Sequence, residues 1–258
     1  MDKSRDQRSA ATDDGLIYKT AQLENQEVTD TELKAINKLA LEPLEASEVF
    51  TFAAVLCDNE LDRQYEQFSL KALKELQKLF IGRTVIKDHY ARADNQVARI
   101  YATELVEHDK TLPSGERYTQ LKAHCYMVRT ESNKDLITEI RAGIKKEGSV
   151  GCRVSSSICS ICGTDNAKSY CPHWPGRSYE KEGGPKVCTF RLDGARDAYE
   201  FSLVAVPAQR AAGVSKNYTG LRVYEPDAAP ALTDDEKEKA RLLGLRSRLA
   251  ASNKHFTI

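Results

Sequence analysis

One run of residues restricts the fold more than any other part of the sequence. Residues 49–56 read Val-Phe-Thr-Phe-Ala-Ala-Val-Leu, so they are almost wholly apolar and rich in residues that favour strands. A strand of this composition is typical of the centre of a sheet, where both faces are buried. Other elements must therefore cover it on both sides. The chain has 258 residues, of which 41% are hydrophobic, enough for one sizeable domain with extra segments or for two small domains.

The remaining periodicity predicts a chain that mixes strands with a few short helices. Thr29 and Ser69 can each cap a run with apolar residues at helical spacing, and a third such run ends at Gly148. Besides the central strand, further strands are predicted at residues 84–86, 97–106, 118–128, 150–154 and 200–206. Within the third of these, Cys125 lies on the apolar face and His124 on the opposite face, which we expect to face solvent.

Charge and hydropathy exclude several classes of protein. Lysine plus arginine number 38 and aspartate plus glutamate also number 38, so no net field attracts the whole molecule to nucleic acid or to a membrane surface. No stretch approaches the roughly 18 uninterrupted apolar residues of a membrane span. The charged N-terminus is not followed by the apolar region of a signal peptide. We therefore expect a globular protein that stays in a cytoplasm, without a membrane partner.

The cysteines gather in one short part of the chain. Five of the seven lie between residues 152 and 188, which in a reducing compartment indicates metal binding rather than disulfides. Cys159-x-x-Cys162-Gly has the form of a zinc knuckle, in which a tight turn brings two thiolates onto one ion. Three further ligands are available at Cys171, His173 and Cys188. Because a tetrahedral structural zinc takes four ligands, one of His173 or Cys188 is left as a spare or supporting residue.

Two other interpretations of Cys159-x-x-Cys162 are a redox motif and accidental clustering. A redox motif normally opens a helix in a βαβ unit, whereas residues 163–166 read Gly-Thr-Asp-Asn, as in a loop. The Gly, Pro and Lys residues around the cysteines cannot build a core, which is the usual reason that a small segment binds a metal ion. We therefore expect structural Zn²⁺ as the cofactor.

Three residues have the chemistry of a nucleophile, a base and an orienting acid. Ser149 lies in Gly148-Ser149-Val150-Gly151, where glycines permit a sharp helix-to-strand turn, and His89 directly follows a predicted strand. Glu200 opens the strand that ends before Pro207. Each residue also has an ordinary explanation, as part of a turn, as an exposed histidine and as a surface carboxylate at a strand edge. His124 is the second candidate for a catalytic histidine.

Taken together, these residues resemble a known family of viral proteases. A strand followed by His89, a gap of 60 positions (149 − 89), Gly-Ser-Val-Gly, and then residues 200–208, Glu-Phe-Ser-Leu-Val-Ala-Val-Pro-Ala, are similar to the tailed-phage prohead proteases. These are serine proteases of capsid maturation that share a fold with the herpesvirus assemblins. The similarity covers roughly residues 47–216. The cysteine-rich insert resembles a branch of the family found in phages of Gram-positive bacteria and related prophages.

The resemblance implies a fold, a mechanism and partners. It implies an α+β fold, a mainly antiparallel β-barrel with peripheral helices, and a small zinc-knuckle insert. Ser149 would be the nucleophile, His89 the general base and Glu200 the third member, with His124 as the fallback because the assemblins use a second histidine in that role. The substrates would be the capsid protein, the scaffold protein and the protease itself. The protein would form a homo-oligomer, a dimer, and act in the cytoplasm of the host bacterium, inside the prohead.

The same features divide the chain into three parts and leave two other functions open. We expect an N-terminal arm and short helix at residues 1–46, a protease domain at 47–216 with the zinc insert at 155–188, and a linker and final helix at 217–258. One alternative is an inactive capsid-assembly or scaffolding protein that keeps the fold. The other is a zinc-stabilised module that binds protein or nucleic acid, although the balanced charge argues against nucleic acid.

Overall fold

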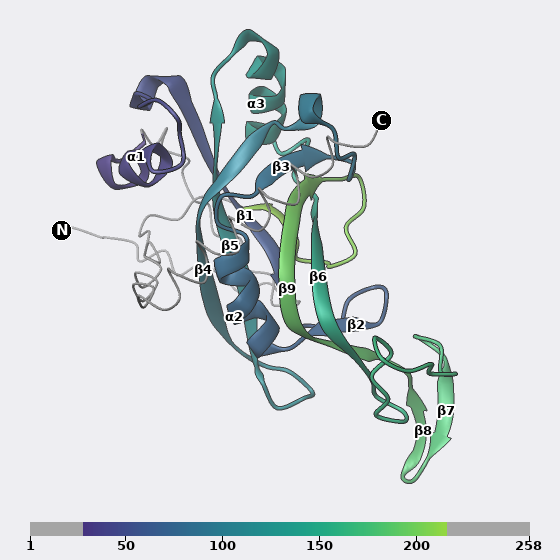
Figure 1. Cartoon of the computed structure of the whole chain (residues 1–258). Coiled ribbons are helices and arrows are strands. Elements are labelled where there is room, and N and C mark those ends of the chain that lie inside the picture. Colours follow the sequence, from purple (N-terminus) through teal and green to yellow (C-terminus); the bar gives the residue numbers. More distant parts are fainter. Residues whose placement is uncertain (1–27, 216–258) are drawn as a thin grey trace, which may run out of the picture.

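A computed structural model describes residues 28–215 as an α+β structure made mostly of strands (Figure 1). The predicted arm at residues 1–27 and the predicted linker and helix at 217–258 lie outside the described residues. The helices are α1 (Asp30–Asn37), α2 (Leu70–Leu79) and α3 (Lys134–Arg141), with 3₁₀ turns at Ala46–Glu48, Ala93–Asn95 and Glu131–Asn133. The strands are β1 (Val49–Asp58), β2 (Glu66–Phe68), β3 (Thr84–Lys87), β4 (Ala98–Thr111), β5 (Arg117–Val128), β6 (Gly148–Cys159), β7 (Ser178–Lys181), β8 (Gly184–Val187), β9 (Phe190–Leu203) and β10 (Gly213–Ser215).

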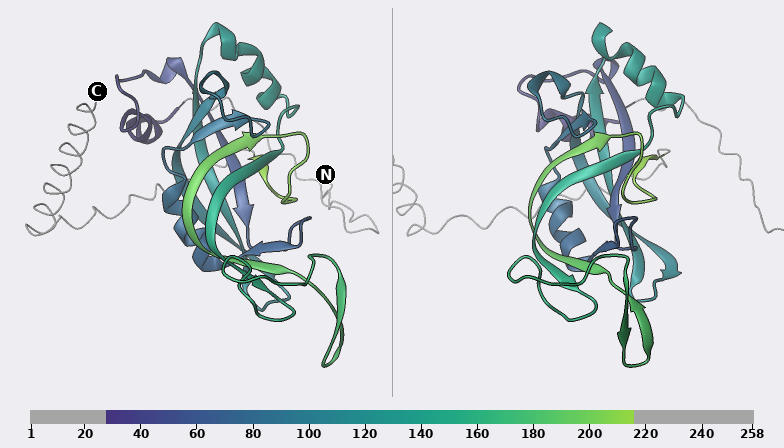
Figure 2. Two further views of the ribbon diagram at one scale, coloured as in Figure 1. Left: turned by 45° about the vertical axis from the view of Figure 1, so that its right-hand side comes forward. Right: turned by 90° about the vertical axis from the view of Figure 1, so that its right-hand side faces the viewer.

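Eight of the strands form one strongly curved sheet. The strand order is β10-β1-β5-β4-β3-β9-β2. Strand β6 lies outside this order and pairs with β9. Most neighbours are antiparallel, but β3 and β2 run parallel to β9. Both views in Figure 2 show β6 and β9 running side by side along their length and continuing into the cysteine-rich segment. That segment carries its own two-stranded sheet, β7-β8.

The expected barrel does not close in the part of the chain that the structure describes. The two ends of the sheet approach each other around an isolated bridge between Glu147 and Gly213, beside the hydrogen bonds from Val214 N–H to the Lys146 carbonyl and from Gly148 N–H to the Ala212 carbonyl. Two features account for this. Within the described residues β10 has three residues, all of which pair with β1, and β6 runs past it toward the cysteine-rich segment. The sheet is therefore curved but open, and the expectation of a closed barrel was wrong.

The central strand is covered on both faces, as the sequence predicted. On one face of the sheet, the main core packs α2 against β9, β4 and β5, with Leu73, Leu76 and Phe80 fully buried, and it includes Phe52 and Leu56 of β1. On the opposite face, α1 places Ile36 in a smaller cluster with Val49, Tyr101 and Tyr126. The predicted cap of α1 is present, because the Thr29 hydroxyl and Glu32 carboxylate bond reciprocally. Ser69 likewise accepts a hydrogen bond from Ala72 N–H at the start of α2.

The expectation for His124 was wrong because α1 covers the face of β5 that was predicted to meet solvent. The His124 side chain is only 8% exposed, and its Nε2 lies 3.1 Å from Glu104 Oε1. Lys122 lies 3.7 Å from the same oxygen. These polar groups therefore satisfy one another beside the small apolar cluster. Within residues 28–215, no helix is long and apolar enough to cross a membrane.

The packing of α2 predicts that substitutions at two adjacent residues change the free energy of unfolding by very different amounts. Replacing fully buried Leu73 with alanine should lower the free energy of unfolding by about 2–5 kcal/mol, since it removes apolar contacts and leaves a cavity. Lys74→Ala, at an exposed position of the same helix, should change it by no more than about 0.5 kcal/mol. Urea denaturation measures both. Equal effects would contradict the assignment of this face to the core.

Candidate active site and metal-binding cluster

The candidate catalytic residues meet where β9 lies between β3 and β6. In this register, Ser202 is opposite Ser149 on β6 and Ile86 on β3, while Glu200 is opposite Gly151 on β6. Side chains that are directly paired, or two positions apart on a strand, project from the same face of a sheet. Ser149, Glu200 and Ser202 therefore share one face, and Phe201 projects from the other face into the main core.

The two glycines around Ser149 do not form the predicted turn. Gly148 and Gly151 belong to strand β6, which pairs with β9 from its first residue. A Cβ atom at Gly151 would collide with Glu200 Oε1, and one at Gly148 would collide with the Phe201 ring. The glycines are thus required for close packing of neighbouring side chains. They leave room for the Glu200 carboxylate on one face of the sheet and for Phe201 on the other.

His89 enters this face from the loop that follows β3. Its Nδ1 lies 2.8 Å from Glu200 Oε1, and its backbone N–H donates to Ser202 Oγ at 2.8 Å. When Glu200 is ionised, Nδ1 must carry the proton of this hydrogen bond, which leaves Nε2 as the acceptor. The His89 side chain is 45% exposed, so a substrate can reach it.

Glu200 is a buried carboxylate with a single side-chain partner. Its side chain is only 11% exposed, and Oε2 is buried without a hydrogen bond in the described part of the chain. Burial raises the pKa of the Glu200 carboxyl above its ordinary value of 4.5, while the hydrogen bond and charge of His89 act in the opposite direction. The pair thus combines an exposed imidazole with a carboxylate that the sheet shields from solvent.

The structure brings together the three residues predicted from the sequence, but it does not join them all by hydrogen bonds. Among residues 28–215, the only side-chain bond within the set is that between His89 and Glu200. Ser149 lies half-buried across the ladder from Ser202, and no hydrogen bond links it to His89 in this range. His124 belongs to the separate cluster beneath α1. The arrangement is a His–Glu pair beside a serine, which are the groups needed for acyl transfer.

Two residues near His89 were missed by the sequence analysis. Ser202 accepts the His89 N–H, and Asn95 donates to the carbonyls of Lys87 and Tyr90 at 2.8 and 2.7 Å. The only sequence signal for Ser202 was its position two residues after Glu200, which puts both side chains on the same face of the predicted strand. Nothing in the sequence singles out Asn95, because its two bonds depend on the conformation of the loop.

A compact group of metal-ligating atoms lies at the far end of β6 and β9. The ligand atoms of Cys159, Cys162, Cys171 and His173 are all within 4.8 Å of one another. Cys162 Sγ is 3.6 Å from Cys171 Sγ, which is 3.5 Å from His173 Nδ1. Ligands at about 2.1–2.3 Å from one tetrahedral ion are separated by roughly 3.5–3.8 Å, so this Cys₃His group could bind a metal ion.

Cys188 is the fifth candidate ligand and lies beside this group. Its Sγ is 3.8 Å from Cys159 Sγ, and the residue is fully buried with Ile161 and Phe190. Its backbone N–H donates to the Arg177 carbonyl, which fixes it where the chain leaves the β7-β8 hairpin. The geometry therefore favours His173 over Cys188 as the fourth ligand. Cys188 becomes a neighbouring buried thiol.

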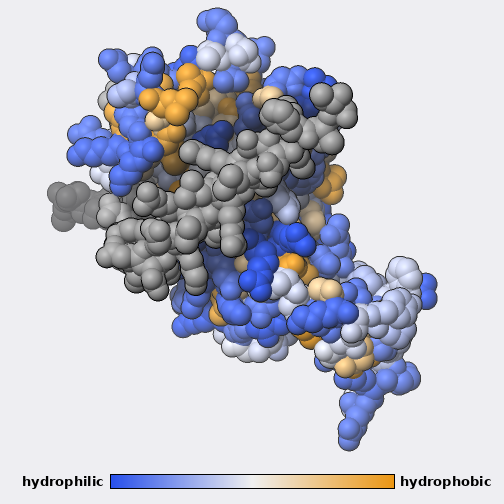
Figure 3. Space-filling model, viewed as in Figure 1, coloured by the Kyte–Doolittle hydropathy of each residue, from blue (hydrophilic) through white to orange (hydrophobic). Residues whose placement is uncertain are grey.

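Cys162 is the most exposed member of the group. Its sulfur lies 3.1 Å from Thr164 Oγ1, and hydrogen bonds with the Thr164 side chain and then its backbone lower the pKa of the Cys162 thiol from 9.0 to about 6. The thiolate is the form that binds metal. Figure 3 shows the segment that contains the cysteines standing away from the rest of the surface, with largely hydrophilic or neutral colouring on the face in view. The small cluster of cysteines, Ile161 and Phe190 is the core of this projection.

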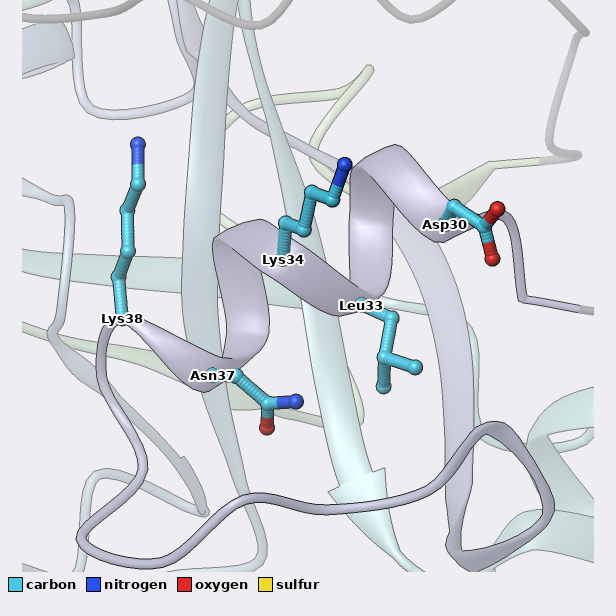
Figure 4. A pocket seen from close by; sticks show the side chains of 5 residues that line it. All are labelled: Asp30, Leu33, Lys34, Asn37 and Lys38. Carbon is cyan, nitrogen blue, oxygen red and sulfur yellow. The ribbon is translucent and has the colours of Figure 1, made fainter.

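Two surface hollows lie apart from these sites. One, of about 380 Å³, follows α1, where Leu33 and Asn37 point to one side of the helix and Lys34 and Lys38 to the other (Figure 4). The other, of about 510 Å³, lies between residues 59–67 and the β4-β5 turn, and Arg210 and Thr189 also line it. Neither hollow is lined by His89, Ser149 or Glu200.

Comparisons with protein-family models, with curated proteins and with solved structures found no match. The geometry of the two sites therefore carries the functional argument.

The two His–Glu pairs predict opposite pH dependences of stability. The pKa of Glu200 is raised on folding, so its contribution to stability is complete below its ordinary value of 4.5 and is lost as pH rises through the raised value. The free energy of unfolding of the wild type, relative to Glu200→Gln, should thus fall as the pH rises above the ordinary carboxyl pKa of 4.5. Urea denaturation at a series of pH values measures the difference.

Glu104→Gln is the matched control for this measurement. The hydrogen bond with His124 lowers the pKa of Glu104 below 4.5, so its contribution is present above 4.5 and is lost as pH falls through the lowered value. The wild type, relative to Glu104→Gln, should therefore gain stability as pH rises. The same slope for both variants would refute the assigned environments.

The Cys₃His group predicts a defined metal stoichiometry. Co²⁺ added to the metal-free protein should bind with about one ion per chain and give the absorption of a tetrahedral thiolate site. Cys162→Ala, Cys171→Ala and His173→Ala should weaken binding by about tenfold or more. Cys188→Ala should bind like the wild type, as should Cys125→Ala, which removes a buried core cysteine elsewhere. If Cys188→Ala loses metal binding while His173→Ala and Cys125→Ala keep it, the site is instead a Cys₄ site.

Proposed function

We propose that this protein is a serine endopeptidase of the tailed-phage prohead type. The observation that carries the proposal is the 2.8 Å contact between His89 Nδ1 and Glu200 Oε1, on the same face as Ser149. An exposed imidazole that is oriented by a buried carboxylate, with a serine beside it, is the constellation that activates a serine hydroxyl. The chain order of His89, Ser149 and Glu200 agrees with the resemblance noted in the sequence. The herpesvirus assemblin-like fold belongs to this proposal.

Each residue has one role in the proposed reaction. His89 Nε2 takes the proton of the Ser149 hydroxyl as Oγ attacks the carbonyl carbon of a peptide bond. The C–N bond then breaks, the imidazolium returns the proton to the leaving amine, and an acyl-enzyme remains. Water, activated by the same imidazole, releases the second product. Glu200 maintains the Nδ1–H tautomer and stabilises the imidazolium, so its removal should cost less than removal of His89 or Ser149.

The proposed substrates are the capsid protein, the scaffold protein and the protease itself, cleaved inside the prohead within the host cytoplasm. The proposed assembly is a dimer. These assignments come from the resemblance to prohead proteases. The structure supports them only through the site chemistry, since peptide cleavage is what a serine with a His–Glu pair can perform.

We further propose that the metal ion is zinc with a structural role. Three cysteines and one histidine fill all four positions of a tetrahedral ion, and a site without an open position binds no substrate. Cys159 is ten positions after Ser149 on β6 (159 − 149), which corresponds to roughly 30 Å of extended chain. The ion would therefore stabilise the projecting segment, whose apolar core is too small to fold alone.

Intact-mass spectrometry over time tests the proposed protease without any assumption about the cleavage sequence. The wild type, alone and with its capsid and scaffold proteins, should produce discrete fragments. Ser149→Ala and His89→Ala should reduce the rate of fragment formation by about 10³-fold or more, because the nucleophile or its base is removed. Glu200→Gln should reduce it less.

Controls are available on the same strand and in the second His–Glu pair. Ser157→Ala removes a β6 serine far from His89, and His124→Ala removes the fallback base; both should cleave at the wild-type rate when folded. Intact substrates with the wild type, in solution and in assembled particles, would refute the protease and leave an inactive assembly protein or a zinc-stabilised binding module. Cleavage that survives Ser149→Ala would refute the assigned nucleophile.

A further inference from the structure

The backbone at Asp88 and His89 has a conformation that is uncommon outside glycine, although Asp and His adopt it more often than most residues. Asp88 and His89 have φ angles of +55° and +52°, and only one other non-glycine residue in the described chain, Tyr65, has a positive φ. In L-residues this left-handed region is disfavoured because Cβ approaches the carbonyl oxygen. Two consecutive residues hold it only when their surroundings impose it, and such strain is concentrated at functional sites.

Strand β9 binds this loop from the inner side. The Asp88 N–H donates to the Leu203 carbonyl at 2.9 Å, and the His89 N–H donates to Ser202 Oγ at 2.8 Å. Ser202 is fully buried, and its Cα position is fixed by pairing with Ile86 on one side and Ser149 on the other. Ser202 therefore connects the two candidate residues, because its backbone pairs with Ser149 and its hydroxyl accepts the His89 N–H.

Asn95 binds the loop from the opposite side. Its side-chain amide donates to the Lys87 carbonyl at 2.8 Å and to the Tyr90 carbonyl at 2.7 Å, which are the peptide groups that flank Asp88 and His89. One amide thus closes the loop across both left-handed residues. A single side chain with two donors is required, because hydroxyl and carboxylate groups cannot donate twice.

We propose that Ser202 and Asn95 are positioning residues that hold the His89 backbone so that its imidazole meets Glu200 and Nε2 faces the serine. The inference rests on the proposed function of this site. Neither residue touches a reacting atom. Without the Ser202 hydroxyl, the His89 N–H loses its partner. Without the Asn95 amide, only the hydrogen bond from the Tyr90 N–H to the Lys87 carbonyl, at 3.1 Å, still spans the loop, so the residues can relax toward ordinary φ values that carry the imidazole away from Glu200.

The test uses two readouts on the full chain. The first is a long-range ¹H–¹⁵N spectrum of histidine-labelled protein at a pH where the imidazole is neutral, with the His89 signals assigned by comparison with His89→Ala. The wild type should show His89 mainly as the Nδ1–H tautomer, since Glu200 accepts that proton. Ser202→Ala and Asn95→Asp should show a mixture of tautomers, as should Glu200→Gln. Ser202→Thr keeps the hydroxyl and should restore the wild-type signal.

The second readout is the split between kcat and KM on a substrate fragment found by mass spectrometry. Ser202→Ala and Asn95→Asp should lower kcat by about 10²-fold with little change in KM, since misplacement of a catalytic group affects the transition state more than binding. Ser157→Ala is the control on the neighbouring strand. Asn95 is in a surface loop and Asn95→Asp is isosteric, so this variant keeps the test available if Ser202→Ala does not fold.

The outcomes separate the two proposals. An unchanged tautomer and an unchanged kcat in both variants overturn the positioning role while the wild-type protease stands. If the two variants change the tautomer of His89 but the wild type cleaves nothing, the positioning of His89 is supported and the proposed protease is refuted. A fall in kcat that Ser202→Thr does not rescue, with the tautomer unaltered, overturns the role of the hydroxyl and indicates general loss of packing.

Discussion

The antiparallel ladder between β6 and β9 is the interaction on which both sites depend. At one end it sets Ser149 opposite Ser202 and Gly151 opposite Glu200, and at the other it pairs Cys159 with Phe190. A shift of one residue would turn every side chain to the other face of the sheet, so a single register fixes the candidate active site and the metal ligands together. The two irregularities in the ladder lie between Gly151 and Val154. They separate the two sites, and such bulges bend a strand and increase its twist, as the curved path toward the projecting segment requires.

The two His–Glu pairs have the same chemistry but lie in different environments. His124 and Glu104 have the same side chains at nearly the same separation as His89 and Glu200. However, His124 is 8% exposed beneath α1, whereas His89 is 45% exposed, and the carboxylates show the reverse order of burial. Burial of the carboxylate with exposure of the imidazole leaves one ring nitrogen available for a substrate. In the other pair, the buried imidazole, the carboxylate and Lys122 satisfy one another's polar groups, and the imidazole is not open to a substrate.

Local sequence patterns predicted those features that depend on neighbours in the chain. The apolar run of β1, the caps at Thr29 and Ser69, and the hairpin of β4 and β5 were each evident from a few adjacent residues. The errors arose where the local structure depends on segments that are distant in the sequence. The face of His124 is buried because α1, about 90 residues earlier, packs on it (124 − 37 = 87 at the nearest). Gly148 and Gly151 are strand residues because Phe201 and Glu200 need their space, and a serine between glycines cannot reveal that partner. Within the described residues the barrel does not close because β6 runs past β10 toward the cysteine-rich segment, a path that no local pattern indicates.

The choice among five candidate metal ligands illustrates the same limit, and here the structure favours one set of four. Spacing alone made His173 and Cys188 equivalent candidates, because both follow Cys171 in a segment without a regular pattern. Cys188, however, is bound by the β-structure around it: its N–H bonds to the Arg177 carbonyl, and Thr189 exchanges hydrogen bonds with Ser160 just before β9 begins. Its sulfur is thus positioned by the sheet, 3.8 Å from Cys159 Sγ. His173 belongs to the loop, and its ring packs edge-on against Tyr179 at 4.6 Å between centroids. With this ring contact, Nδ1 lies 3.5 Å from Cys171 Sγ, so the hairpin β7-β8 that supplies Tyr179 would hold His173 in place as a candidate fourth ligand.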